Sequence, residues 1–240
     1  EFSEVAKQTG KSSVDVIQGT TKAVQSGIQD LDQALVFARQ SAIFSNVGDV
    51  EQGEADTILA GIMSAYGGVE NSLKPVREQI QGMSKDYSTL TKFMDLANHA
   101  GNNYAVTTAD VGEALRQSAS TLQAQGVSME QSVGMAVALN EIMQDAGRTG
   151  TALKSMSTGM AGLTVSAKDG SIQLTKAGVA MKEVAGIDVW NEQTGELKNM
   201  YEVMDELSIK WGDLSEAEQT ALGASIAGKT RITEFNALLS

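Results

Sequence analysis

The residue types that most enzymes use at their reactive centres are scarce in this chain. His99 is the single histidine among 240 residues, and there is no cysteine. This composition excludes disulfides, thiolate zinc sites, HExxH helices and histidine-rich metal clusters. A Ser–His–Asp site would have to use His99 itself, and no G-x-S-x-G elbow is present. We interpret His99 as a surface residue near a helix C-terminus, a position that the helix dipole favours for histidine.

Two further patterns suggest chemistry and are better explained by helix ends. The run Gly147–Lys154, G-R-T-G-T-A-L-K, lacks the G-x-x-x-x-G-K-[ST] spacing of a phosphate loop and follows a helix instead of a strand. We interpret it as a turn in which Gly147 ends one helix and Thr149 or Thr151 begins the next. The pairs Asp205/Glu206 and Glu216/Glu218 could act as acid and base, but a carboxylate in a first helical turn is favoured by the dipole.

The sequence therefore predicts no catalytic, cofactor-binding or metal-binding residue. The methionines could form an adaptable binding surface, but at helical spacing they are more typical of core filler (Met135, Met143, Met156, Met160 and Met181). The small-residue spacing Ser155-x-x-x-Gly159 indicates two closely packed helices.

One predicted helix, 128–146, organises the chain. Its residues Met135, Ala138, Leu139, Ile142 and Ala146 share one face, and a second apolar group follows another (Met129, Val133, Ala136, Val137 and Met143). A narrow stripe of Glu130, Gly134, Glu141 and Asp145 is left for water. Ser128 with Gln131 forms a capping box, and Gly147 supplies the stop. We expect this helix to lie at the centre of the fold.

Helical periodicity, often opened by a cap, recurs along the chain. Caps are predicted at Ser12/Asp15, Thr107/Asp110 and Ser215/Glu218. The face formed by Val111, Ala114, Leu115, Ser118 and Leu122 should pack on the central helix. Pro75 can occupy a first helical turn. The other expected helices are 13–26, 31–46, 51–66, 74–83, 89–100, 109–125, 151–163, 171–184, 200–211, 216–227 and 232–239.

The expected fold class is mainly α: a multi-helix domain of packed helical hairpins with one small β-hairpin near residues 186–198. Alternating Ile187 and Val189, followed by the turn residues N-E-Q-T-G, predict that hairpin. Glycines about 20 residues apart suggest a weak hairpin repeat that matches no named solenoid. We expect an N-terminal helical region (1–85), a central helical core (86–168) and a C-terminal helical part with the β-hairpin (169–240).

Charge and hydropathy narrow the classes of partner. The net charge is −12, with 30 acidic and 18 basic residues, and the basic residues form no cluster, so direct nucleic-acid binding is not expected. The longest uncharged stretch, 96–109, is too short and too polar to span a membrane, and we expect a soluble piece. The ends of the chain are typical of a fragment of a longer polypeptide. Aromatic residues make up only 5% of the chain and there are 24 glycines, which predicts modest stability.

Four segments occur in an order that matches a known family. They are V-G-E-A-L-R-Q-S-A-S-T-L-Q-A-Q-G-V-S-M-E-Q (111–131), G-T-A-L-K-S-M (150–156), G-I-D-V-W-N-E-Q-T-G-E-L-K-N-M (186–200) and L-S-E-A-E-Q-T-A-L-G-A-S-I-A-G-K-T-R (214–231). Over residues 90–239 the chain resembles the core region of tail tape measure proteins of long-tailed bacteriophages, and residues 4–19 resemble the stretch upstream. The loop at 147–150 is shorter than the family's form, and Gln193-Thr194 precede Gly195 in the turn.

The resemblance implies a structural virion protein without cofactor or catalytic residues. Such proteins set tail tube length during assembly, occupy the tube lumen, and are released ahead of the DNA during genome ejection. The implied partners are the tail tube protein, tail assembly chaperones, tail-tip proteins and, after release, the host envelope. The resemblance also implies several copies in the tail of a virion assembled in the host cytoplasm. Stretched as one helix, 240 residues would span about 360 Å, whereas a compact fold would have a radius of gyration of about 18 Å. We therefore expect an extended and a compact state.

Two alternatives remain open from the residues. The first is a helical protein–protein interaction module at the tail tip. The second is a cell-wall hydrolase domain of the transglycosylase type, which would need Glu113 or Glu141 as its catalytic carboxyl group.

Overall fold

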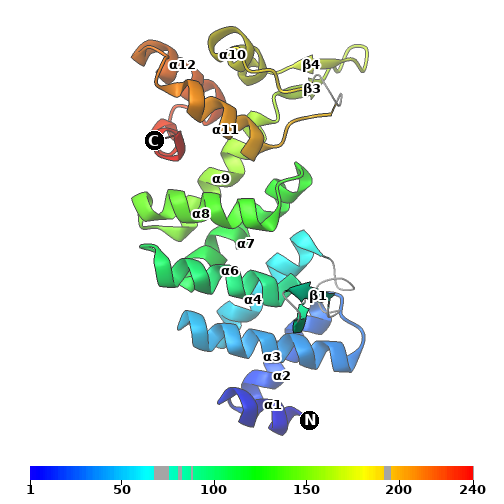
Figure 1. Cartoon of the computed structure of the whole chain (residues 1–240). Helices are drawn as coiled ribbons and strands as arrows, with labels where there is room; N and C mark the ends of the chain where they lie inside the picture. The colour runs from blue at the N-terminus through cyan, green and yellow to red at the C-terminus, as the bar shows by residue number, and fades with distance from the viewer. Residues whose placement is uncertain (68–75, 81–82, 88, 192–195, 240) are drawn as a thin grey trace.

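The computed structural model describes residues 1–67, 76–80, 83–87, 89–191 and 196–239, and most of them are helical (Figure 1). The twelve helices among these residues are α1 (Phe2–Thr9), α2 (Ser13–Gln25), α3 (Leu31–Gly48), α4 (Gln52–Tyr66), α6 (Thr89–Asn103), α7 (Thr108–Ala124), α8 (Met129–Met143), α9 (Ala146–Met160), α10 (Lys176–Ala185), α11 (Met200–Trp211), α12 (Glu216–Ile226) and α13 (Ile232–Leu239). Strands β1 (Val76–Ile80) and β2 (Met83–Tyr87) form one antiparallel pair, and β3 (Leu163–Val165) and β4 (Ile172–Leu174) form another. The mainly α fold class is confirmed.

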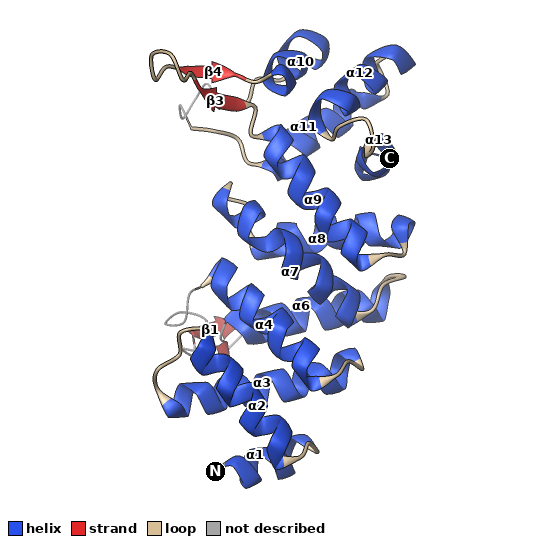
Figure 2. Ribbon diagram, turned by 180° about the vertical axis from the view of Figure 1, so that it is seen from behind, coloured by secondary structure: helices blue, strands red, loops and turns tan. Residues whose placement is uncertain are grey.

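The helices from α1 to α9 are arranged as two columns. In the α7 column, α2, α4, α7 and α9 pack successively on one another; in the α8 column, α1, α3, α6 and α8 do the same. Consecutive helices also pack across the two columns. Figures 1 and 2 show the result from opposite sides: an elongated stack with α1 and α2 at one end and α10 and α12 at the other. Each layer therefore contacts chiefly its immediate neighbours, as in a solenoid.

Helix α7 is the most extensively packed element. It contacts α4, α6, α8 and α9, and its predicted apolar face is fully buried. Its closest neighbour is α9, because a Cβ atom at Gly150 would overlap the carbonyl oxygen of Ala114. The sequence correctly predicted that α7 packs on α8, but α4 and α9 cover more of α7. The organising helix of the stack is thus α7, and the prediction that the 128–146 helix is central was wrong in that respect.

The predicted caps are confirmed. Capping boxes form at Ser12–Asp15, Thr107–Asp110, Ser128–Gln131 and Ser215–Glu218. Helices α11 and α13 have the predicted limits, and α2, α3, α4, α6, α7 and α12 differ from prediction by at most a few residues. A helix at Phe2–Thr9 was not predicted.

The junction between α8 and α9 was predicted wrongly. Gln144 adopts the left-handed conformation (φ 50°) and ends α8, and the Asp145 side chain accepts a hydrogen bond from Arg148 N at 2.9 Å and begins α9. Gly147 therefore lies inside α9 and does not end a helix. Because an aspartate N-cap satisfies an otherwise unpaired N–H, the helix begins five residues before the predicted start at 151.

The surface of α8 also differs in part from expectation. Glu130, Gly134 and Glu141 are exposed as predicted. Ala138 and Ile142 were placed on a buried face, yet Ile142 is 57% exposed and Ala138 is also exposed. These two positions lie beside grooves that face the C-terminal helices.

Two segments that were predicted to be helical form strands instead over part of their length. Residues 76–80 pair with 83–87 where a helix was expected at 74–83, and Pro75 lies outside the described residues. Within the expected helix 171–184, Ile172 pairs with Val165, and α10 begins only after Thr175 caps Gly178 N at 3.1 Å. Each of these strands pairs with the next strand along the chain, and helical spacing alone does not reveal such a pairing.

The predicted hairpin near 186–198 is present as a short antiparallel bridge. Trp190 pairs with Leu197, Lys198 N donates to Val189 O at 2.9 Å, and Asn191 N donates to Glu196 O at 2.8 Å. Its turn, with Gln193 to Gly195, lies outside the described residues.

Candidate interaction surfaces

The residues that suggested chemistry lie on separate helices. His99 is exposed on α6, where the amide nitrogen of Asn103 lies 3.3 Å from Nδ1. The run Gly147–Lys154 forms the first turns of α9, so no phosphate loop exists there. Among the described residues, no group of three or more histidine or carboxylate side chains could hold a metal ion. The absence of a catalytic, cofactor or metal site nevertheless stays a prediction.

The acidic residues serve as caps and ion-pair partners. The Ser215 hydroxyl hydrogen bonds to Glu218 and lowers the pKa of that carboxyl group. Glu206 pairs with Lys198 at 2.7 Å, while Asp205 is exposed. Glu216 occupies the first turn of α12, as expected.

The two transglycosylase candidates are held in unsuitable states. Glu113 accepts hydrogen bonds from Arg116 at 2.6 and 2.7 Å, which lower the pKa of the Glu113 carboxyl group. A general acid for glycoside cleavage needs a raised pKa. Glu141 is exposed and accepts a hydrogen bond from Ala105 N at 3.1 Å.

A buried polar cluster joins α3 to α4. Asp56 is 3% exposed and accepts hydrogen bonds from Ser41 Oγ at 2.5 Å and Gln52 Nε2 at 2.8 Å. Burial raises the pKa of the Asp56 carboxyl group. Residues 41, 52 and 56 come from two helices of the stack, and nothing in the sequence marked them as a group. The cluster fixes the register of α3 on α4 because the hydrogen bonds of Ser41 with Asp56 and Gln52 form only in this arrangement.

Tyr66 links α4 to α8 in a similar way. Its hydroxyl group donates to Ser132 Oγ at 2.6 Å, and burial raises the pKa of Tyr66 to about 12. The phenol therefore stays neutral at physiological pH.

An apolar groove runs between α3 and α6, which we call the α3–α6 groove. Val36, Ile43 and Val47 of α3 line it and are 42%, 37% and 47% exposed. Met94 and Thr91 line it from α6. Its volume is about 340 Å³, and Arg39 and Asp95 lie among its lining residues.

A second groove, the α8–α11 groove, has a similar volume of about 340 Å³. Its lining residues come from α8, α11 and α13: Gly134, Met135, Ala138, Tyr201, Met204, Asp205, Ser208 and Leu238. Met135 is 6% exposed, and Met156, Met160 and Met181 are buried deeper in the core. The prediction that the methionines fill the core is therefore confirmed for these four, whereas Met143 is only partly buried against the core. Gly159 also lies against the Ile226 carbonyl group, which confirms the close helix pair predicted from Ser155-x-x-x-Gly159.

Comparison with known proteins identifies the family. The family model of phage-related minor tail proteins matches residues 2–228, which is nearly the whole chain. This chain belongs to the phage-related minor tail protein family. Its role is therefore structural, in a phage tail.

One similar protein is described more specifically than the family. A protein of Halomonas phage phiHAP-1, described as "Probable tape measure protein", is 28% identical over 137 residues. The matched part covers 54% of this chain and 14% of that protein, so this minor tail protein chain spans only a small part of its relative's length. No solved structure matches the chain. In the described ranges no helix combines the length and the apolar character that a membrane span requires.

Proposed function

We propose that this chain is part of a tape measure protein that sets the length of the tail tube and occupies its lumen. On this proposal the protein leaves ahead of the DNA during genome ejection. The observation that carries the proposal is the one-dimensional stack, in which each helical layer packs chiefly on its neighbours. A stack of this kind can open layer by layer into an extended chain, whereas a core with many long-range contacts must unfold as a unit.

The caps support an extended state. Capping boxes such as Thr107–Asp110 and Ser128–Gln131 join residues three positions apart and need no neighbouring helix. The contacts between layers, in contrast, are made by buried apolar side chains such as Phe44 and Phe93, and by small residues such as Gly150 where helices approach most closely. Opening the stack would therefore remove the inter-layer packing and leave the helix-end hydrogen bonds in place. An extended helix is only about 10–12 Å wide, which suits a tube lumen.

The proposed partners are those of the tail. They are the tail tube protein, assembly chaperones and tail-tip proteins, with host envelope contact after release and several copies in each tail. The net charge of −12 supports a component that repels the following DNA instead of binding it. We also propose that the chain is not an enzyme, which the pairing of Glu113 with Arg116 supports. The division of the chain into the regions 1–85, 86–168 and 169–240 also remains a proposal.

A second candidate function is a folded interaction module at the tail tip. The α3–α6 and α8–α11 grooves favour it, because both are apolar and open on the surface of the folded stack. The two functions differ in the state of the chain within the tail: extended for the ruler, folded for the module.

Tail length separates the two functions. In-frame deletion of residues 127–147 removes α8, the N-cap Asp145 and the first two residues of α9, and the ruler predicts tails about 31 Å shorter by electron microscopy. An in-frame duplication of the same 21 residues is the matched variant and should lengthen tails by the same amount. Tails of unchanged length in both variants would contradict the ruler and support the folded module.

A further inference from the structure

The Asp56 carboxyl group is buried without a charged hydrogen-bond partner. Two carboxyl groups are buried among the residues that the structure describes, those of Asp56 and Glu234, which are 3% and 7% exposed. Glu234 pairs with Arg148 at 3.0 Å, whereas the hydrogen bonds to Asp56 come from the neutral side chains of Ser41 and Gln52. Burying a charge costs free energy that neutral donors offset only in part. The folded stack therefore favours the protonated, neutral form of Asp56.

Three helices close over this carboxyl group. Ser41 belongs to α3 and Gln52 to α4, and the two side chains also bond to one another at 3.0 Å. From the third side α2 approaches with its backbone, since a Cβ atom at Gly19 would lie 3.1 Å from Asp56 Oδ1. Gly19 has no side chain that could donate a hydrogen bond, so at this point α2 excludes water without replacing it. Separation of α2 and α3 from α4 would return water to Asp56.

The charges around Asp56 do not remove the cost of its burial. Burial raises the pKa of the Asp56 carboxyl group, and the hydrogen bonds from Ser41 and Gln52 lower that pKa by less. Two charged groups on α2 have smaller and opposite effects: Lys22 lowers the pKa of Asp56, and Asp15 raises it. The pKa in the folded chain thus lies above the ordinary value of 3.8, and the stability that protonated Asp56 provides is lost as the pH rises through the raised pKa.

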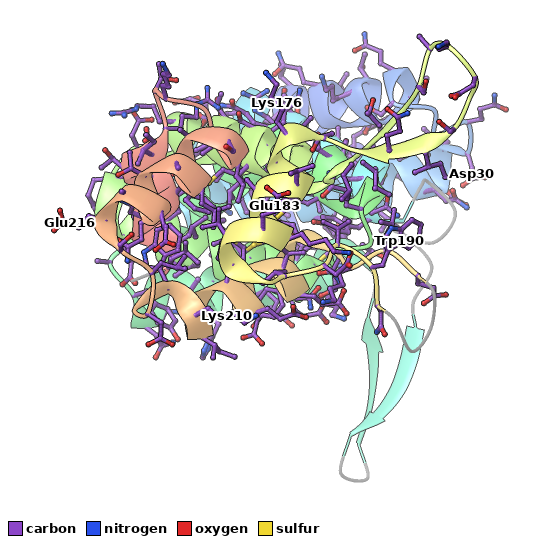
Figure 3. The ribbon with its side chains drawn as sticks, turned by 90° about the horizontal axis from the view of Figure 1, so that it is seen from above. Asp30, Lys176, Glu183, Trp190, Lys210 and Glu216 are labelled. Carbon is purple, nitrogen blue, oxygen red and sulfur yellow. The ribbon has the colours of Figure 1, made fainter. Side chains whose placement is uncertain are left out.

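The Asp56 cluster lies far from the C-terminal helices. Figure 3 looks along the stack from the C-terminal end: Glu183 of α10 and Glu216 of α12 lie on the near helices, and Asp30, the N-cap of α3, belongs to the layers at the other end. Helices α2 and α3 pack on α4, and α4 packs in turn on α7. Because each layer contacts chiefly its neighbours, α2 and α3 can separate from α4 while α7 and α9 stay packed.

We propose that a proton on Asp56 controls where the stack opens first: α2 and α3 stay on α4 while Asp56 is protonated, and separate from it more often once Asp56 is ionised. This control rests on the proposed opening of the stack by layers. Opening is measured in the free chain and the ruler by tail length, so either can fail while the other holds. At neutral pH the α2–α4 layers should open before the α7–α9 layers.

Hydrogen exchange of the whole chain between about pH 4.5 and pH 7 tests the proposal. Protection factors, which correct for the pH dependence of chemical exchange itself, should fall about three- to tenfold in α2, α3 and α4 and stay nearly constant in α7 and α9. Asp56→Asn should abolish this fall, because the amide is uncharged at either pH. Glu54→Gln is the matched control, since Glu54 is an exposed carboxylate on the same helix, and it should leave the fall unchanged. A fall of equal size in all layers, or one that persists in Asp56→Asn, would overturn the proposal.

Ser41→Ala separates control by the proton from a merely structural role of the cluster. The Ser41 hydroxyl group donates to Asp56 at 2.5 Å and lowers the pKa of that carboxyl group, so its loss should make ionisation costlier. Protection in α2, α3 and α4 should then fall more steeply with pH than in the unmodified chain. A cluster that only held α3 in register on α4 would lose protection by the same factor at both ends of the pH range, and that result would contradict the proposal.

Discussion

The α1–α9 stack and the part of the chain after Met160 hold their elements together differently. From α2 to α9 the helices are 13 to 18 residues long and pack through apolar and small residues along their length. Among the described elements after Met160 none exceeds 12 residues, and specific polar contacts add to their apolar packing. Lys210 Nζ donates to Ala185 O at 2.9 Å, and Arg148 pairs with Glu234 at 3.0 Å. The stack thus repeats the same arrangement of long helices, whereas the C-terminal part combines short elements, buried apolar side chains and a few polar contacts over longer distances in the sequence.

This difference bears on how each part can open. Loss of one inter-layer contact in the stack leaves the other layers packed, because each layer contacts chiefly its neighbours. In the C-terminal part, α13 returns to α8 and α11, where Trp211 and Phe235 meet edge-to-face at 5.6 Å. We therefore expect α10–α13 to behave as one closed unit and the stack to behave as a series.

The largest effect is expected where two layers are closest. Gly150→Val should destabilise the chain by about 3 kcal/mol, because the added side chain would overlap the Ala114 carbonyl group and separate α7 from α9. Urea unfolding measures the change. Gly134→Ala on α8 is the control, since a Cβ there meets no atom within 4 Å, and it should be neutral or slightly stabilising. Equal destabilisation by the two variants would contradict the role of close packing.

A smaller and local effect is expected at the C-terminal end. Arg148→Ala should cost about 1–2 kcal/mol, because it leaves the buried Glu234 carboxyl group without its ion-pair partner. Hydrogen exchange should accelerate in α11 and α13 and stay unchanged in α2 and α4. Faster exchange spread evenly over the stack would show that the C-terminal part and the stack do not open independently.

The smallest effect concerns pH and the Asp56 cluster. Because burial raises the pKa of Asp56 above its ordinary value of 3.8, the folded state binds the proton more tightly than the unfolded state. Its contribution to stability is therefore greatest below pH 3.8 and is lost as the pH rises through the raised pKa. Asp56→Asn should remove this dependence. At pH 7 it should stabilise the chain by about 1 kcal/mol, because it removes a buried carboxylate while its oxygen can still accept from Ser41 and Gln52.

Glu113→Gln should change the pH dependence of stability in the opposite direction. Hydrogen bonds from Arg116 lower the pKa of Glu113 below its ordinary value of 4.5, so its contribution is present above pH 4.5 and is lost as the pH falls through the lowered pKa. Thermal unfolding of both variants from pH 3 to pH 7 should give pH dependences changed in opposite directions. A change in the same direction in both variants would contradict the raised pKa of Asp56 or the lowered pKa of Glu113.

Local signals account for the part of the fold that the sequence predicted. A capping box such as Ser215–Glu218 lies within one turn, and α11 between Asn199 and Trp211 carries its own start signal. The errors lie where two signals compete or where a strand pair forms in a segment whose spacing is helical. Asp145 and Gly147 are both ordinary helix-end residues, and only the structure shows that Asp145 begins α9. The pairing of Ile172 with Val165 depends on a turn that periodicity does not detect.

The candidate surfaces were less predictable than the helices. The helical period shows that Val36, Ile43 and Val47 share one side of α3, but not that this side borders α6 in the α3–α6 groove. The α8–α11 groove depends in the same way on which helices become neighbours. Burial of Asp56 with Ser41 and Gln52 requires the register between α3 and α4, which is a tertiary property.

The most direct test of the central claim is whether residues 48 and 109 are neighbours inside the tail. A Cβ at Gly48 would lie 3.7 Å from that of Ala109, a separation suited to a disulfide, so a Gly48→Cys/Ala109→Cys chain should oxidise readily when free and folded. In an extended helix the same positions would be about 90 Å apart. Our account predicts that the intramolecular disulfide forms in the free chain and not in purified tails, with each single variant as control. A disulfide that forms equally well in assembled tails would show that the stack is folded there and would contradict the ruler.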